Sequence, residues 1–269
     1  MNFLVQQQPA FVATADASAT AFDPSRPTAV FIHGAGNDHS VWRAVMPNIA
    51  AQSWNTLAPD LPGHGATFAA AKASIAGYAD WIINLLDNGA ITRAALIGHS
   101  MGSLIALECA RRHADRVSQL VLVGTAVPMP VSDKVLQAAQ SAPEQAYDMI
   151  ARASFFAERH ADGSWPPPTP VMQETRALLS RNRQGALAAD LAACAAFECA
   201  PDALGHVTVP TTVVIAREDR MTAPEGGNAV AEAIPGARAV WLERVGHMMI
   251  CEAPAAVAAA VTSAIIPSS

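Results

Sequence analysis

Short apolar runs alternate with helical patterns along most of the chain. The runs are β-rich and mostly uncharged, as expected for parallel strands that are covered on both faces. They predict strands over 28–32, 55–58, 94–97, 120–123, 211–215 and 239–242. The spacing of apolar residues between them predicts helices over 41–51, 74–86, 100–113, 224–233 and 253–266. Such alternation is typical of an α/β domain with a mostly parallel sheet.

The alternation stops between residues 127 and 205, where no strand pattern appears. Helical patterns cover 133–140, 144–158, 171–181 and 187–197, and prolines at 166–168 and 170 interrupt them. We therefore expect a core domain formed by residues 1–126 and 206–269, with a helical insertion at 127–205. Residues 1–15 are expected to add an antiparallel strand or hairpin at the edge of the sheet.

Composition and charge exclude several classes of protein. Hydrophobic residues make up 51% of the 269 residues and charged residues 15%, which excludes a disordered chain. The net charge is −6 and no stripe of Lys and Arg is visible, so we expect neither a nucleic-acid partner nor a polybasic membrane contact. Residues 1–10 do not resemble a secretory signal, and the apolar stretch 253–266 is shorter than a membrane span.

The cysteines and the glycines indicate no cofactor. Cys109, Cys194, Cys199 and Cys251 form neither a C-x-x-C pair nor a zinc-ligand spacing. We expect four buried thiols in a reducing compartment, and hence a cytoplasmic protein without a metal ion. The glycines at 34 and 36 do not continue into a G-x-G-x-x-G dinucleotide fingerprint.

The most specific motif is Gly98-His99-Ser100-Met101-Gly102. It follows the apolar run 94–97 and opens a helical run, which is the strand–turn–helix context that a G-x-S-x-G motif requires. A sharp turn places the serine in a strained conformation above the sheet edge, and its neighbours must be small to avoid the adjacent strand and helix. The N-terminus of the helix favours negative charge nearby. Ser100 is therefore the candidate nucleophile.

A serine nucleophile needs a base and an acid that orients the base. Among eight histidines, His247 lies between the last predicted strand and the C-terminal helix, which completes the chain order Ser, Asp, His. Asp219 lies just past the strand 211–215, and sites gather at the carboxyl ends of parallel strands. Glu218 is the competing acid. The predicted triad is Ser100, His247 and Asp219.

Acyl transfer also needs donors that stabilise an oxyanion. The backbone N–H of Met101, directly after the nucleophile, is one candidate. The loop at 33–36 supplies the other, and we expect the N–H of Ala35 because glycines flank it and let the backbone approach a substrate. Four aromatic residues are candidates for an acyl pocket, with core packing as the favoured alternative: Trp42, Phe155, Phe156 and Trp165.

These residues together resemble the α/β-hydrolase family over nearly the whole chain apart from the insertion. Residues 33–36 resemble its oxyanion loop, 59–65 the loop after its fourth strand and 98–102 its nucleophile elbow. Asp219 followed by Pro224 resembles the acid loop, and residues 246–254 resemble the histidine loop and last helix. The chain departs from the family pattern with Ala66-Thr67 after Gly-His-Gly, and with Ser103 after the elbow.

The resemblance implies an eight-stranded, mostly parallel sheet with flanking helices and a helical lid at 127–205. It implies hydrolysis of a small carboxylic ester or lactone through an acyl-enzyme on Ser100. A serine nucleophile disfavours the dehalogenase and epoxide hydrolase branches, which use aspartate. Two alternatives stay open: a C–C bond hydrolase or lyase with the same triad, and a ligand-binding receptor with a vestigial triad. The resemblance names neither a physiological substrate nor an oligomeric state.

Overall fold

An eight-stranded sheet forms the centre of the protein. The computed structural model describes residues 1–15, 22–158, 160–162, 164–200 and 202–266. The strand order is β1-β2-β4-β3-β5-β6-β7-β8. Strands β3 to β8 pair in parallel, whereas β1 pairs with β2, and β2 with β4, in antiparallel register. The strands are β1 (Asn2–Val5), β2 (Gln8–Ala13), β3 (Thr28–Ile32), β4 (Asn55–Pro59), β5 (Ala94–His99), β6 (Val117–Val123), β7 (Thr211–Ala216) and β8 (Arg238–Leu242). The α/β fold with an antiparallel edge is confirmed.

Helices cover both faces of this sheet. Val30 of β3 packs in one hydrophobic cluster and the next residue, Phe31, packs in another, because successive side chains of a strand point to opposite faces. The first cluster includes residues of α2 (Ile75–Asn88), α3 (Met101–Arg112) and α8 (Pro224–Ala233). The second includes residues of α1 (Met46–Ala50), α9 (Met249–Glu252) and α10 (Pro254–Ile265). The result is a helix–sheet–helix sandwich with two cores.

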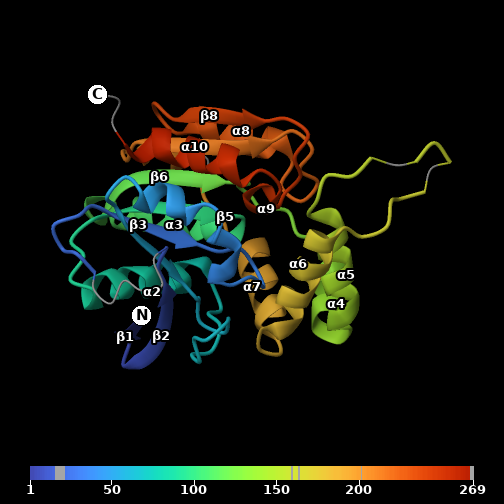
Figure 1. The fold of residues 1–269 in the computed structure, drawn as a ribbon, viewed down its shortest axis with the longest axis horizontal. Helices are drawn as coiled ribbons and strands as arrows, with labels where there is room; N and C mark the ends of the chain where they lie inside the picture. The colour runs from blue at the N-terminus through green and yellow to red at the C-terminus, as the bar shows by residue number, and fades with distance from the viewer. Residues whose placement is uncertain (16–21, 159, 163, 201, 267–269) are drawn as a thin grey trace.

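Four helices between β6 and β7, here called the helical insertion, lie beside these layers, and Ala193 and Cys194 of the last of them pack in the first cluster. The four helices are α4 (Asp133–Ser141), α5 (Pro143–Ala153), α6 (Pro170–Arg181) and α7 (Ala186–Ala195). Figure 1 shows them grouped together beside one end of the sheet. A third hydrophobic cluster joins them, with Ala146, Ile150, Leu179 and Leu187 among its buried members.

Two predicted helices differ from their sequence pattern, one by an interruption and one by an earlier end. The predicted helix over 41–51 is instead a 3-10 turn, η1 (His39–Trp42), followed by the short helix α1. Pro47 explains the break, because in a continuous helix its ring would collide with the carbonyl of Arg43. The predicted helix over 144–158 ends at Ala153, and the carbonyl of the next residue, Ser154, accepts a hydrogen bond from Met248 N–H at 2.8 Å.

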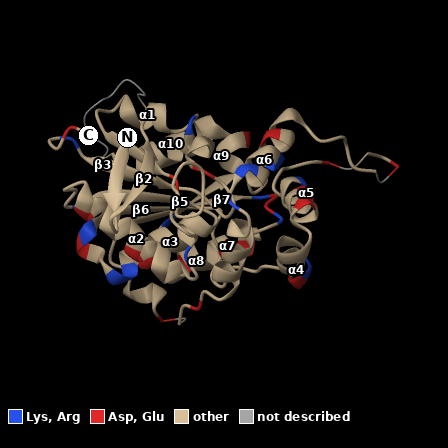
Figure 2. Cartoon of the chain, turned by 90° about the horizontal axis from the view of Figure 1, so that it is seen from below, with Lys and Arg blue, Asp and Glu red and all other residues tan. Residues whose placement is uncertain are grey.

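Charged residues of both signs are interspersed over the surface elements in Figure 2. No helix in the described part of the chain is long and apolar enough to span a membrane.

The prediction of four buried thiols is wrong for two of them. Cys109 and Cys194 are buried, whereas Cys199 and Cys251 are half-buried, and all four are free.

Candidate active site

Ser100 lies in the tight turn that joins β5 to α3. Its backbone has φ 54° and ψ −121°, a strained conformation for a residue with a side chain. A Cβ added to Gly98 would lie 2.1 Å from the carbonyl oxygen of Gly102, and one added to Gly102 would lie 2.2 Å from that of Ile32. Only glycine fits at either position, which is the physical reason for the motif. Ser103, the departure from the family pattern, donates its hydroxyl to the Ser100 carbonyl at 2.6 Å.

Asp219 and His247 form a buried pair at the ends of β7 and β8. The Asp219 Oδ2 atom lies 2.8 Å from His247 Nδ1, and the two residues are 5% and 3% exposed. The Asp219 Oδ1 atom accepts the backbone N–H groups of Met221 and Thr222 at 2.8 and 2.9 Å. Burial raises the pKa of the Asp219 carboxyl, but His247 and the hydrogen bonds outweigh it and hold the pKa below its ordinary value.

Thr222 is a neighbour of this pair that the sequence reasoning missed. Its hydroxyl donates to Asp219 Oδ2 at 2.7 Å and lies 3.2 Å from His247 Nδ1. The spacing Asp-x-x-Thr after a strand was an available signal, because an aspartate at the start of a turn often accepts hydrogen bonds from residues two and three positions ahead.

Glu218, the competing acid, faces a different group. Its Oε2 atom accepts the backbone N–H of Val245 at 3.0 Å, and its side chain is only half-buried. Glu218 therefore holds the loop that follows β8, whereas Asp219 contacts the imidazole. The geometry favours Asp219 as the partner of His247.

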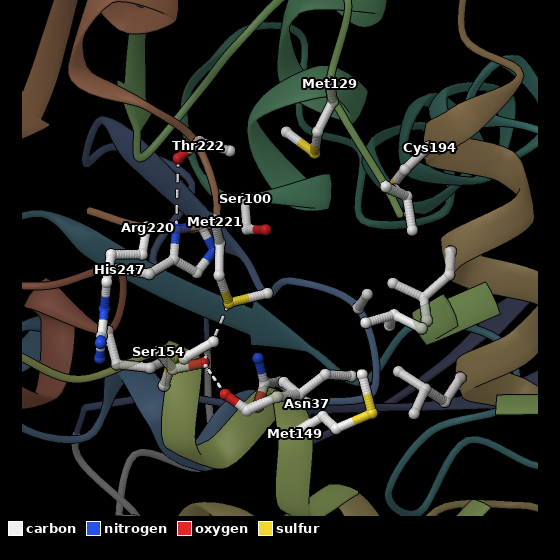
Figure 3. A pocket seen from close by; sticks show the side chains of 18 of the residues that line it. Asn37, Ser100, Met129, Met149, Ser154, Cys194, Arg220, Met221, Thr222 and His247 are labelled. Atoms are coloured by element: carbon white, nitrogen blue, oxygen red, sulfur yellow. Dashed lines mark hydrogen bonds between the residues drawn. The ribbon is translucent and has the colours of Figure 1, made fainter. Parts of the chain in front are cut away.

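Ser100 and His247 line the same cavity, and Figure 3 shows the imidazole beside the serine side chain. Among the described residues, the serine hydroxyl makes no hydrogen bond to the imidazole that meets ordinary distance and angle criteria. Catalytic hydrogen bonds are often long in ligand-free structures and tighten when substrate binds. The two side chains are thus brought together at one cavity without a formed bond.

Two further side chains hold the loop that carries His247. His99 Nε2 donates to the His247 carbonyl at 2.9 Å, and burial together with the neighbouring His247 lowers the pKa of His99 to about 3. Glu252 accepts the N–H of Gly246 on Oε1 and that of Phe156 on Oε2, each at 2.9 Å. Burial raises the pKa of Glu252. The sequence pattern placed Glu252 beside the last helix without indicating this role.

The loop between β3 and η1 carries the first expected oxyanion donor. Ala35 lines the cavity, and its N–H donates to no acceptor within the described residues. His33 is fully buried; its Nδ1–H donates to the Gly34 carbonyl at 2.9 Å and its Nε2 accepts Leu61 N–H at 3.0 Å. Burial and the neighbouring His64 lower the pKa of His33 to about 4, so the ring is neutral. Met101, the second expected donor, is the first residue of α3, where backbone N–H groups lack helical acceptors.

The cavity that contains Ser100 has a volume of about 350 Å³ and a mainly apolar wall. Its floor is formed by the elbow and the loops of the core domain, and its apolar wall comes largely from the helical insertion. The insertion supplies Val135, Met149, Ile150, Thr175, Leu179, Leu187, Leu191 and Cys194. A cavity of this size and polarity suits a small, mainly apolar ligand.

The predicted acyl-pocket aromatics lie elsewhere, so that prediction is corrected. None of the four is among the described residues that line the cavity. Trp42 packs against Phe31 in the second core, with ring centroids 5.3 Å apart. Phe155 is buried in the same core, and Phe156 and Trp165 lie against the guanidinium groups of Arg244 and Arg220. Shorter aliphatic and sulfur-containing side chains line the cavity instead.

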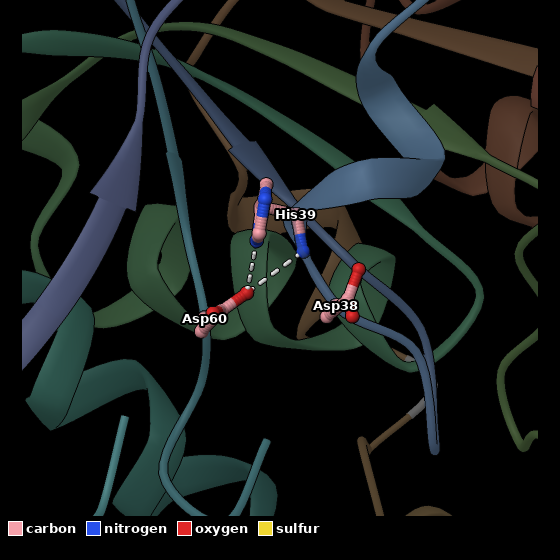
Figure 4. A group of neighbouring side chains, drawn as sticks. All are labelled: Asp38, His39 and Asp60. Atoms are coloured by element: carbon pink, nitrogen blue, oxygen red, sulfur yellow. Dashed lines mark hydrogen bonds and ion pairs between the residues drawn. The ribbon is translucent and has the colours of Figure 1, made fainter. Parts of the chain in front are cut away.

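One group of described side chains has potential metal-ligand atoms close together. It consists of Asp38, His39 and Asp60, whose ligand atoms lie within 4.8 Å of one another (Figure 4). Internal hydrogen bonds already use these groups. Asp60 accepts His39 Nδ1–H at 2.7 Å, His39 N–H at 2.9 Å and Ala66 N–H at 2.8 Å. Burial raises the pKa of Asp60, but these hydrogen bonds outweigh it and lower the pKa. The group is sufficiently explained as a brace between two loops.

The sheet order, the flanking helices and the strand–turn–helix unit around Ser100 place the protein in the α/β class. A family model described as the alpha/beta hydrolase family matches residues 29–260, and the chain belongs to this family. It is therefore a hydrolase.

Similar proteins include a pimeloyl-[acyl-carrier protein] methyl ester esterase from Aromatoleum aromaticum. That relative is 28% identical over 236 residues, which cover 83% of this chain and 92% of the relative. The solved structure of an enol-lactonase from Burkholderia xenovorans has a TM-score of 0.85 and 25% identity and covers 99% of this chain and 100% of that one. A hydrolase structure from Pseudomonas aeruginosa has a TM-score of 0.84 and 23% identity and covers 99% and 98%.

Proposed function

We propose that this protein hydrolyses a small carboxylic ester or lactone through an acyl-enzyme on Ser100. The observation that carries the proposal is the buried Asp219–His247 pair, 2.8 Å apart, at the cavity that also contains the strained Ser100. The esterase and enol-lactonase among the similar proteins support the same reaction class.

In the proposed mechanism, His247 Nε2 removes the proton of the Ser100 hydroxyl as its oxygen attacks the carbonyl carbon. Asp219 accepts the Nδ1–H of His247, which fixes the tautomer and stabilises the imidazolium. The tetrahedral oxyanion is bound by the N–H groups of Ala35 and Met101, each worth about 3 kcal/mol in the transition state. The imidazolium then protonates the leaving alkoxide, and a water molecule activated by His247 releases the acid.

The cavity wall favours a neutral, apolar acyl group. Arg220 is the one Lys, Arg, Asp or Glu side chain among the described residues that line it. Its guanidinium donates to the carbonyl oxygens of Arg152 and Phe155 at 3.1 and 2.8 Å and lies 4.9 Å from the Trp165 ring centre. This cation is occupied by protein acceptors, so the wall offers little to a substrate carboxylate. We infer that the helical insertion acts as the lid over this acyl site.

Substitution of Ser100 tests the assignment of the nucleophile. We expect Ser100→Ala to abolish turnover of 4-nitrophenyl esters and labelling by a fluorophosphonate, while circular dichroism and the urea midpoint stay near those of the wild-type chain. Ser103→Ala, three residues away on α3, is the control and should still be labelled. Retained turnover by Ser100→Ala would contradict the proposed nucleophile.

Products distinguish the proposed reaction from its rivals. Mass spectrometry of a panel of esters, lactones and vinylogous diketones identifies whether a C–O or a C–C bond is cleaved. Tight ligand binding with no turnover of any of these compounds would favour a receptor, whereas stoichiometric labelling of Ser100 by a fluorophosphonate would favour an enzyme. The cytoplasmic location stays a prediction.

A further inference from the structure

One buried acid of the helical insertion reaches into the core domain beside the expected oxyanion loop. Asp190, on α7, is fully buried. Its Oδ1 atom accepts the hydroxyl of Tyr78 at 2.6 Å, and its Oδ2 atom accepts the backbone N–H of Gly36 at 2.9 Å. His64 Nε2 lies 2.8 Å from the same Oδ2 as an ion-pair contact. A buried carboxylate is costly unless donors surround it, so these three groups tie α7 to the core.

A second side chain of the insertion binds the other side of the same residue. Asn182, directly after α6, donates its Nδ2–H to the carbonyl of Gly36. Its Oδ1 atom accepts the N–H of Gly65 at 3.0 Å, from the loop that follows β4. The N–H and the carbonyl of Gly36 are therefore both held by side chains from the insertion.

Side chains of the insertion also pack closely against Gly36. Its φ is +66°, which favours glycine, and a Cβ there would lie 2.7 Å from Leu179 Cδ2 and 2.9 Å from Leu187 Cδ1. Both leucines belong to the insertion and also line the cavity. The oxyanion loop is thus enclosed by helices that come from a distant part of the sequence.

The position of Gly36 also affects the orientation of the Ala35 N–H, because the two residues are joined through the backbone. Gly34 C=O and Ala35 N–H belong to one peptide group, and that carbonyl accepts both His33 Nδ1–H at 2.9 Å and Asn37 N–H at 3.2 Å. Asn37 follows Gly36 directly, so the position of Gly36 sets the turn that orients this peptide group. His33 fixes the peptide from the core side, and the insertion fixes it from the other.

We propose that Asp190 and Asn182 are positioning residues: together they clamp Gly36 and so orient the Ala35 N–H toward the oxyanion. The helical insertion then has two roles, because it bounds the acyl site and also completes the oxyanion hole. The inference rests on the proposed hydrolysis at Ser100. It predicts that loss of the clamp weakens transition-state stabilisation for every acyl group, whatever its length.

The test compares Asp190→Asn and Asn182→Ala with the wild-type chain on 4-nitrophenyl acetate and 4-nitrophenyl octanoate. Fluorophosphonate titration gives the concentration of intact sites, and kcat is expressed per site. We expect kcat to fall roughly 10- to 100-fold on both esters with KM changed less than about twofold, a smaller loss than complete removal of an oxyanion donor. Asp148→Asn, at an exposed position on α5, is the matched control and should leave kcat unchanged.

The outcomes separate the clamp from other roles. Wild-type kcat per site in both variants overturns the inference, as does a loss confined to the octanoate through a raised KM, which would indicate a role in the acyl site alone. If Asp190→Asn does not fold, Asn182→Ala decides by the same readout, since Asn182 is only half-buried. Failure of the wild-type chain to hydrolyse either ester contradicts the proposed function instead.

Discussion

At Asp219, four donors share one buried carboxylate. Two backbone N–H groups, one hydroxyl and one imidazole surround its two oxygens at 2.7–2.9 Å. A carboxylate that accepts this many hydrogen bonds is stabilised in its charged form. The acid is therefore ready to stabilise an imidazolium without moving.

This geometry predicts a large difference between two adjacent acids. Asp219→Asn should lower kcat on a nitrophenyl ester by roughly 10⁴-fold, because an amide at this position favours the wrong tautomer of His247. Glu218→Gln is the matched control: its amide oxygen still accepts Val245 N–H, and we expect kcat within about threefold of wild type, as for surface changes of small effect. A larger loss in Glu218→Gln than in Asp219→Asn would identify the wrong acid.

Buried histidines make stability depend on pH. Burial and neighbouring charge lower the pKa of His99 to about 3 and that of His33 to about 4 in the folded protein, against 6.5 for an ordinary histidine. Below pH 6.5 the unfolded chain binds protons that the folded protein does not, so acid favours unfolding. His64 acts in the opposite sense: although burial lowers its pKa, Asp190 outweighs this and raises it, so its stabilising contribution is lost as pH rises.

We expect the free energy of unfolding to fall between pH 6.5 and 4, with His99 contributing about 1.4 kcal/mol per pH unit. Urea unfolding at several pH values measures this slope. His99→Gln should reduce the slope, whereas the exposed His206→Gln should leave it unchanged. Equal slopes for the wild-type chain and His99→Gln would contradict the buried neutral state of His99.

At the scale of elements, close backbone contacts on both sides of Ser100 fix the turn between β5 and α3. Gly98 lies against the first turn of α3, and Gly102 lies against the end of β3. Strand, helix and neighbouring strand approach closely enough that no side chain fits between them. The strained φ of Ser100 persists because these contacts determine the turn.

Gly98→Ala should lower the free energy of unfolding by about 3 kcal/mol or more and slow fluorophosphonate labelling of Ser100, because the added methyl collides with backbone. Gly205→Ala is the matched control. A Cβ at Gly205 meets nothing within 4 Å, so we expect a change within about 0.5 kcal/mol. Urea unfolding measures the free energy of unfolding of both variants. An unchanged value for Gly98→Ala would show that the turn can relax around the added methyl group.

For the whole molecule, the cavity lies between two parts of the chain. The core domain contributes the candidate catalytic groups, and the insertion contributes much of the apolar wall. Substitutions of cavity-lining residues of the insertion, other than those that hold Gly36, should therefore change which acyl group is accepted while the groups around Ser100 stay in place.

Val135→Trp tests this division. Val135 lines the cavity from α4, and a larger side chain there should shorten the acyl chain that fits. We expect kcat/KM for 4-nitrophenyl octanoate to fall roughly 10-fold or more, while that for the acetate changes less than about twofold. Lys134→Trp, at the adjacent exposed position, should leave both values unchanged. An equal loss on both esters would place Val135 outside the acyl site.

The features that depend on local order along the chain could be predicted from the amino-acid sequence. β3 and α8 have their predicted bounds, and the other core strands differ by one to three residues at an end, because apolar periodicity and turn residues act over short distances. The Gly98–Gly102 motif could be identified from its spacing alone, because the steric constraint on its residues lies mainly within one strand–turn–helix unit. The prediction of one helix over 41–51 overlooked Pro47, although a proline disfavours a continuous helix and this signal is local.

The features that join distant segments follow only from the packing of the folded chain. The cavity is lined by Leu187 and Met149 rather than the predicted aromatics, because apolar character does not indicate which core a side chain enters. The Thr222 hydroxyl lies 3.2 Å from His247 Nδ1, 25 positions along the chain, and Asp190 meets Gly36 across 154 positions. Such contacts depend on how whole elements pack, and no local pattern of hydrophobic and polar residues carries that information.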